Sequence, residues 1–174
     1  GMSRGLGDVY KRQILNGGLK KWIFENKPIT KLTTEIIKSN YVTNEKKNLV
    51  VSFDQIKKNI LSKSFNVIDA RSLERFEGKV SEPRKGLRSG HIQNSFCLPF
   101  NQCINQKTGE FKNLEELREL FNQNENIEKR LDQVFTCGSG VTAAVLAYAY
   151  KMINNDYIPK IYDGSWSEYG KYPA

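Results

Sequence analysis

Long apolar runs are absent from this sequence. No stretch approaches the roughly 18 consecutive apolar residues that a membrane-spanning helix needs. Residues 1–18 also contain no apolar core segment of the kind that a secretory signal peptide carries. We therefore expect no membrane partner and a cytoplasmic location.

Cysteine and histidine are scarce, with three cysteines and one histidine in 174 residues. Cys97, Cys103 and Cys137 are odd in number and lack Cys-x-x-Cys spacing, which argues against a disulfide framework and against a zinc site. His91, the single histidine, forms no obvious Cys-His or Ser-His dyad. We expect no metal and no cofactor.

Positive charge is in excess, but it is not arranged as in a nucleic-acid-binding protein. The chain has 27 Lys and Arg against 19 Asp and Glu, a net charge of +8 and a pI near 9.3. Its lysines occur in dispersed pairs without interleaved aromatic residues, so we expect no nucleic-acid partner. The charge indicates a solvated surface with a mild attraction for anionic substrates.

The stretch around Cys137 is the most informative part of the chain. A short apolar run from Val134 to Thr136 precedes the cysteine, and strong helix formers at helical spacing follow from Thr142 onward. This pattern predicts a strand, a tight loop and a helix, with the loop amides and the helix dipole facing the sulfur. A helix amino end lowers a cysteine pKa below its free value of about 8.5, which predicts a nucleophilic thiolate. The alternative is a buried cysteine that acts as a small hydrophobic residue.

The sequence Cys-Gly-Ser-Gly-Val-Thr-Ala from Cys137 to Ala143 resembles the active loop of the mercaptopyruvate sulfurtransferases, in the rhodanese superfamily. The resemblance implies a persulfide on the cysteine, held by the loop residues Gly138, Ser139, Gly140, Val141 and Thr142. In thiosulfate-preferring rhodaneses a basic pair typically follows the cysteine, so Gly138-Ser139 favours 3-mercaptopyruvate as the sulfur donor. A rhodanese-like phosphatase would need a larger loop and a cation where this chain has Ala143.

Arg75 and Arg84 stand nine residues apart around an irregular, charged loop. A guanidinium group matches a carboxylate bidentately, although the residues alone leave solvated surface charges as an alternative. The resemblance implies that these two arginines hold the carboxylate and ketone oxygens of mercaptopyruvate. It also implies that His91 braces its own loop. Asp69 and Arg71 could be catalytic, but a structural ion pair is the favoured interpretation.

Apolar strands alternate with amphipathic helices in the rest of the chain. Strands are predicted at residues 50–51, 65–69, 134–136 and 159–162, with another short one after the Gly90-His91-Ile92 loop. Helices are predicted at residues 53–60, 113–121 and 143–152; Ser52 with Gln55 and Asn113 with Glu116 form capping boxes. This order favours an α/β fold with a mainly parallel sheet and helices on both faces. The rhodanese resemblance, over about residues 49–172, implies about five strands.

A local repeat suggests how the chain is organised. The residues around Asn16-Gly17 resemble those around Asp163-Gly164, and each set indicates a strand end, a glycine turn and a first helical turn. A chance match of two turns is the alternative. We expect residues 1–28 to be a cloning remnant followed by the tail of a preceding rhodanese domain. Residues 29–48 are then a linker, and residues 49–174 the catalytic rhodanese domain.

The resemblance implies a sulfurtransferase. The Cys137 thiolate would take sulfur from 3-mercaptopyruvate, release pyruvate and pass the sulfur to cyanide or to a thiol such as that of thioredoxin. Ser139 would relay a proton together with a His and an Asp of the first domain, so we expect weak or no activity from this chain alone. The alternatives are a thiosulfate sulfurtransferase and a non-catalytic scaffold module; the intact Cys137 argues against the scaffold.

Overall fold

The structure is a computed structural model of the chain, and it describes residues 13–38, 40, 42 and 47–173. The chain divides into two units: Gly1–Val42 with Ile104–Phe111, and Thr43–Cys103 with Lys112–Ala174. The cloning remnant expected at Gly1-Met2 and the start of the expected tail lie outside the described residues. No helix among the described residues has the length and apolar character that crossing a bilayer requires.

The second unit is built on a parallel sheet. Its strands are β1 (Phe65–Asp69), β2 (Phe96–Cys97), β3 (Asp132–Thr136) and β4 (Lys160–Ile161), in the spatial order β2-β1-β3-β4. All three pairings are parallel, with Val67 opposite Val134 in the central pair. Val50 adds one further segment through an isolated parallel bridge to Ile161. The expected α/β fold with a parallel sheet is thus confirmed, and the strand expected at residues 50–51 is reduced to this bridge.

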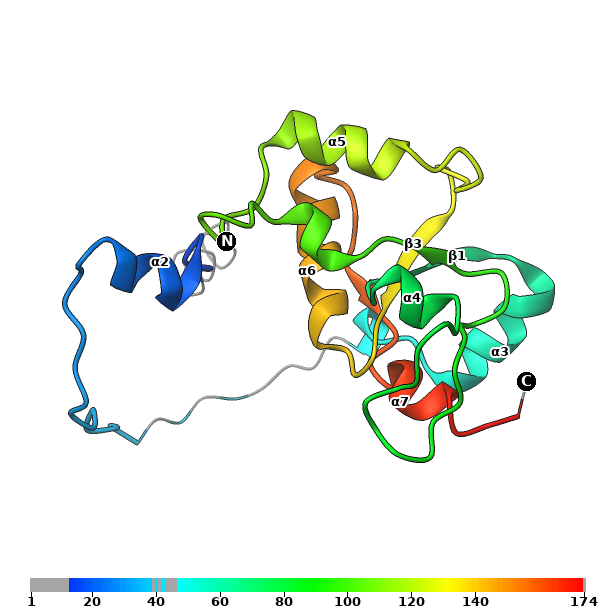
Figure 1. Cartoon of the computed structure of the whole chain (residues 1–174), viewed down its shortest axis with the longest axis horizontal. Coiled ribbons are helices and arrows are strands. Elements are labelled where there is room, and N and C mark those ends of the chain that lie inside the picture. The colour runs from blue at the N-terminus through cyan, green and yellow to red at the C-terminus, as the bar shows by residue number, and fades with distance from the viewer. Residues whose placement is uncertain (1–12, 39, 41, 43–46, 174) are drawn as a thin grey trace. The chain divides into compact units, whose positions relative to one another are not determined.

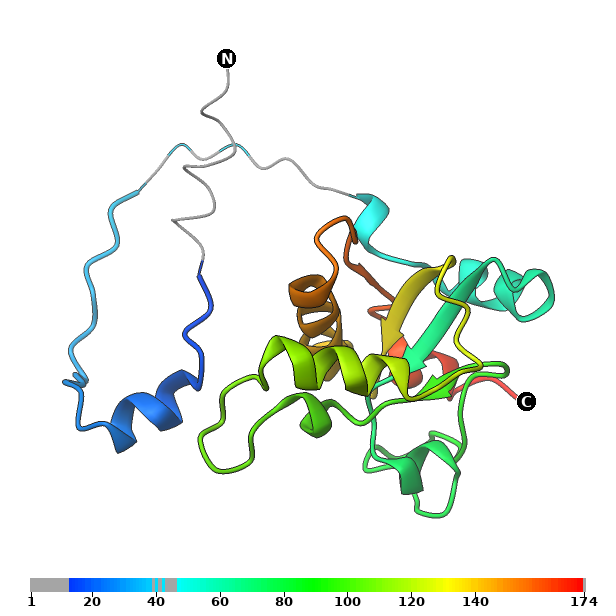
Figure 2. The same ribbon diagram turned by 90° about the horizontal axis from the view of Figure 1, so that it is seen from above.

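Helices cover both faces of the sheet (Figures 1 and 2). α5 (Leu114–Asn122) and α6 (Val141–Ile153) pack on one face, and α3 (Phe53–Ser62) and α7 (Ser165–Tyr169) pack on the other. α4 (Leu73–Phe76) and the 3-10 turns η1 (Lys47–Leu49) and η2 (Phe100–Cys103) lie in connections. The capping boxes predicted at the starts of α3 and α5 are both present. Each satisfies two amides that a helix start leaves without partners.

The core follows the alternation of the two central strands. Val67 and Val134 face one side, where they pack with Ile56 of α3 and Trp166 of α7. The neighbouring residue Phe135 faces the other side, where aromatic rings from α5 and α6 surround it. Both faces are therefore apolar, which explains why β1 and β3 are buried along almost their whole length.

The first unit contains α2 (Gly18–Phe24), which follows Gly17 at φ +90°. Asn16 accepts a hydrogen bond from the Phe111 amide at 2.9 Å, and Lys21 forms an ion pair with Glu110. A helix follows the glycine in both places, but Gly17 adopts φ +90° and Gly164 φ −53°, and the strand end predicted before Gly17 is not formed. A Cβ on Gly17 would meet Lys21, and one on Gly164 would meet Glu168, four residues on in each case. Residues 13–15 and 27–38 have no regular secondary structure.

Candidate functional site

Cys137 lies directly after β3, at the carboxyl end of a central strand, where parallel sheets place their ligands. Gly140, at φ +82°, is the N-cap of α6, and this left-handed conformation favours glycine. A Cβ at position 140 would also collide with the carboxylate of Asp163. The sharp turn from strand to helix therefore depends on Gly140, and it folds the loop back over the cysteine sulfur.

The Cys137 sulfur is buried, with 2% of the residue exposed, and yet it is surrounded by hydrogen-bond donors. Burial raises the pKa of the thiol, but the Thr142 hydroxyl and the amides of Ser139, Ala143 and Thr142 lower it, and the net pKa lies below the ordinary value. The Ser139 amide lies 3.4 Å from Sγ. Donors that favour the charged form can thus outweigh the desolvation of a thiolate. Sequence reasoning did not include Ala143 among these donors.

The start of α7 forms hydrogen bonds with the backbone of Cys137 and Gly138. The Cys137 amide donates to Oγ of Ser165 at 3.2 Å, and the Cys137 carbonyl accepts from the Trp166 amide at 2.9 Å. The Gly138 carbonyl accepts from the Ser167 amide at 2.9 Å. Sequence analysis treated residues 163–166 only as a turn and a helix start. The resemblance of residues 163–166 to the stretch around Asn16 indicated a similar local structure, but it gave no indication that residues 165–167 contact the backbone of Cys137 and Gly138.

A cavity of about 250 Å³ opens beside the sulfur. Arg75, Arg84, Cys137 and Ser139 all line it, together with Gly138, Val141 and Thr142 from the loop. The structure thus brings together the two predicted arginines, the predicted nucleophile and most of the predicted loop. Gly140 is buried beneath the turn and does not line the cavity.

Arg75 is not a free cation. Its Nε and Nη2 donate to the two carboxylate oxygens of Glu82 at 3.2 and 2.6 Å. Glu82, whose side chain is 2% exposed, also accepts from Arg71, and Arg71 in turn pairs with Asp69 at 2.7 Å. The ion pair expected for Asp69 and Arg71 is confirmed, and it extends into a network of two arginines and two carboxylates in which only Arg75 is partly exposed.

Arg84 has a different environment, because it is exposed and donates a hydrogen bond to a neutral group. Its Nη1 donates to the Gly138 carbonyl at 3.2 Å. No carboxylate in the part of the chain that the structure describes forms an ion pair with Arg84, and its guanidinium lies next to the loop that carries the nucleophile. An anionic substrate in this cavity would meet one neutralised and one available guanidinium.

The remaining candidate residues lie outside this cavity. His91 stacks on Phe76 at 3.9 Å between ring centroids, and its Nδ1 donates to the Phe76 carbonyl at 2.8 Å, as a loop brace would. Burial raises the pKa of Cys97 and of Cys103 to about 12, so both stay protonated. Among the described residues, no group of three His, Cys, Asp or Glu side chains could hold a metal ion.

Comparison with known proteins agrees with this geometry. A model of the rhodanese-like domain matches residues 52–172. The chain belongs to the rhodanese family. Within that family it is similar to 3-mercaptopyruvate sulfurtransferase from Homo sapiens, with 35% identity over 156 residues, 90% of this chain and 52% of that protein.

Two further rhodanese relatives extend the comparison. Thiosulfate/3-mercaptopyruvate sulfurtransferase 1, mitochondrial, from Arabidopsis thaliana is 42% identical over 126 residues, 72% of this chain and 32% of that protein. SseA from Escherichia coli, whose crystal structure is described as that of a 3-mercaptopyruvate sulfotransferase, superimposes with a TM-score of 0.74 at 29% identity. That match covers 90% of this chain and 56% of SseA. The chain spans about half, or less, of the length of these relatives.

Proposed function

We propose that this rhodanese chain transfers sulfur through a persulfide on Cys137, with 3-mercaptopyruvate as the donor. The observation that carries the proposal is the set of donors around the sulfur, which lowers its pKa although the residue is buried. The relatives named as mercaptopyruvate sulfurtransferases support the same reaction. A scaffold module would have no need for a stabilised thiolate next to an arginine-lined cavity.

The proposed first step is an attack of the Cys137 thiolate on the thiol sulfur of 3-mercaptopyruvate. A sulfur–sulfur bond forms, the carbon–sulfur bond breaks, and its electron pair leaves with carbon as the enolate of pyruvate. The new persulfide gives up its proton, and the enolate takes one up to become pyruvate. The amides that face Sγ would stabilise the persulfide anion in the same way as the thiolate.

Arg84 and Arg75 have unequal roles in this proposal. Arg84 pairs with the substrate carboxylate, because among the described residues no carboxylate forms an ion pair with it. Arg75 offers only the Nη1 end of a guanidinium that Glu82 already holds, and it serves to orient the ketone oxygen. An ideal Cβ on Gly138 would lie 3.0 Å from Nη2 of Arg75. A basic residue at position 138, as in thiosulfate-preferring rhodaneses, would place a cation against this guanidinium.

The second half of the reaction needs an acceptor, which we propose to be a thiol such as that of thioredoxin, or cyanide in an assay. Residues 1–28 are proposed to be a cloning remnant followed by the end of a preceding rhodanese domain, in line with the partial coverage of the relatives. The cytoplasm is the proposed compartment, although one relative is named mitochondrial. Fractionation of cells that express the native protein checks the compartment.

Intact mass spectrometry tests the central step. After mixing with 3-mercaptopyruvate we expect the chain to gain the mass of one sulfur atom, with the modification on Cys137 in the digest. Cys137→Ser is expected to gain nothing, and Cys103→Ser to behave as the parent. Labelling of Cys97 or Cys103 in place of Cys137 would contradict the proposal. Thiosulfate as the better donor in the same assay would favour the second candidate, a thiosulfate sulfurtransferase, which the name of the plant relative also includes.

A further inference from the structure

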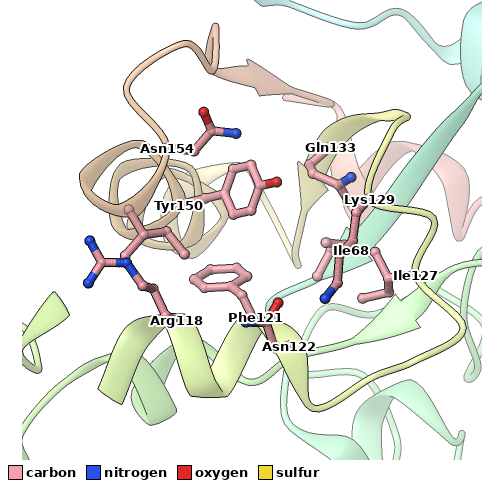
Figure 3. A pocket seen from close by; sticks show the side chains of 10 residues that line it. Ile68, Arg118, Phe121, Asn122, Ile127, Lys129, Gln133, Tyr150 and Asn154 are labelled. Carbon is pink, nitrogen blue, oxygen red and sulfur yellow. The ribbon is translucent and has the colours of Figure 1, made fainter. Parts of the chain in front are cut away.

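A second cavity, of about 330 Å³, lies under α5 and α6 at the far end of β3 from Cys137 (Figure 3). Its volume is within the range of small-molecule sites. Tyr150 and Ile153 line it from the end of α6, and at 1.5 Å per residue Tyr150 is roughly 14 Å along the helix from Val141. The cavity shares no lining residue with the one beside Cys137.

Five of the ten residues that line this second cavity are apolar or aromatic. Ile68 and Phe121 are buried, and Ile127 and Tyr150 are half-buried. The rings of Phe121 and Tyr150 meet edge to face, with 5.2 Å between their centroids. Figure 3 shows these two rings next to each other, with Gln133 and Lys129 across from them. A planar ring of a ligand can pack against such walls.

Two cations stand at the rim. Arg118 on α5 and Lys129 in the loop before β3 are exposed, and in the described part of the chain neither forms an ion pair. None of the described residues that line this cavity is acidic. Asp132, three residues after Lys129, is already paired with Lys160. The rim therefore favours an anion.

Gln133 supplies an unpaired acceptor. The residue is 2% exposed, and its Nε2 donates to the carbonyls of Leu131 at 2.7 Å and of Glu128 at 3.4 Å, which fixes the orientation of the side-chain amide. Its Oε1 has no hydrogen-bond partner, alone among the buried side-chain polar atoms that the structure describes. A buried acceptor without a donor is rare in folded proteins. Gln133 lines this cavity and a neighbouring one at the start of β3, and Oε1 itself is closed to water, so an N–H or O–H group of a ligand bonds to it only after the side chain turns.

We propose that this cavity binds a small aromatic carboxylate that carries an N–H or O–H donor. The ring packs on Phe121 and Tyr150, and the carboxylate lies between the charges of Arg118 and Lys129, which stand on opposite sides of the cavity (Figure 3). The donor bonds to Oε1 of Gln133 once that side-chain amide turns toward the ligand. The proposal does not depend on sulfur transfer, because no residue of the Cys137 site takes part in it.

Indole-3-acetate is a suitable probe, because it combines a planar ring, a carboxylate and an N–H group. We expect saturable binding to the whole chain with a dissociation constant at or below about 1 mM, measured by NMR titration, with shifted signals of Phe121, Ile127 and Ile153. Indole-3-acetamide lacks the charge and 1-methylindole-3-acetate lacks the N–H, so each should bind at least about fivefold more weakly.

Surface variants locate the carboxylate. Arg118→Gln and Lys129→Gln should each weaken indole-3-acetate about fivefold and leave indole-3-acetamide unchanged. Lys58→Gln, on the exposed side of α3, is the matched control and should change neither affinity. The proposal is overturned if indole-3-acetate fails to saturate by about 10 mM, if the acid and the amide bind equally, or if Arg118→Gln and Lys129→Gln both bind the acid as the parent does.

Discussion

The amide of Cys137 donates to Oγ of Ser165, a residue 28 positions away that is fully buried at the start of α7. The same hydroxyl donates to the Tyr162 carbonyl at 2.8 Å and lies 3.3 Å from Oγ1 of Thr136. Ser165 adopts φ +50°, a conformation that is uncommon for residues other than glycine. One side chain thus joins the end of β3, the residue after β4 and the backbone of the nucleophile.

Ser165→Ala should therefore destabilise the fold. The substitution leaves the buried Cys137 amide without its acceptor, and we expect the free energy of unfolding to fall by about 1–3 kcal/mol, measured by urea denaturation. Ser167→Ala is the matched control, because that hydroxyl is only half-buried and makes one bond, to the Gly164 carbonyl. If the two variants lose the same stability, Ser165 is not the anchor that the structure indicates.

The pH dependence of Cys137 alkylation tests the donors around its sulfur. The thiolate is the reactive form, so the rate with iodoacetamide rises with pH and reaches half of its maximum at the pKa. We expect that midpoint below the free value of about 8.5, because the Thr142 hydroxyl and three amides favour the thiolate. Cys97 and Cys103, with pKa values of about 12, should contribute little background.

Thr142→Val should move the alkylation midpoint of Cys137 upward. The substitution removes the hydroxyl donor that contributes most to lowering this pKa, while it keeps the shape of the side chain. Thr142→Ser keeps the hydroxyl and should leave the midpoint near that of the parent. A midpoint that stays unchanged in Thr142→Val would show that the amides alone hold the thiolate.

Turnover by this chain alone should be slow even if the persulfide forms. Glu82 is the acidic side chain in the lining of the Cys137 cavity, and it is held by Arg71 and Arg75, so it cannot readily give a proton to the enolate. Loss of general acid catalysis costs about 10²–10⁴-fold in rate. We expect pyruvate release from 3-mercaptopyruvate to be at least about 100-fold slower than with the human relative under the same conditions. Equal rates would mean that the residues described here are sufficient.

The parts of this structure that could be predicted from sequence are those that depend on neighbours in the chain. Ser52 and Asn113 start their helices through contacts three residues away, and the Cys137 loop is set by its own glycines. The role of Glu82 as a partner of Arg71 and Arg75 was not predicted, because only the tertiary fold brings these two arginines to its carboxylate. The unpaired acceptor of Gln133 could not be predicted from the sequence either, since the packing of the folded chain determines that no donor reaches Oε1.

The two arginines of the Cys137 cavity should respond differently to substitution. Arg84→Gln removes an exposed charge, so its stability should change by no more than about 0.5 kcal/mol. Its KM for 3-mercaptopyruvate should rise about tenfold, as expected for the loss of one charge-assisted hydrogen bond to the carboxylate. Arg75→Gln should instead lower the free energy of unfolding by about 1–3 kcal/mol, because buried Glu82 loses one of its two guanidinium partners.

Combining Arg75→Gln with Glu82→Gln separates the effect of Arg75 on stability from its effect on substrate binding. In Arg75→Gln with Glu82→Gln the uncompensated carboxylate is gone, so part of the lost stability should return, although Arg71 then keeps only Asp69 as an anionic partner. KM for 3-mercaptopyruvate should stay raised in the double variant if Arg75 also orients the ketone oxygen. A double variant with the KM of the parent would show that Arg75 only balances the charge of Glu82, and that Arg84 alone recognises the substrate.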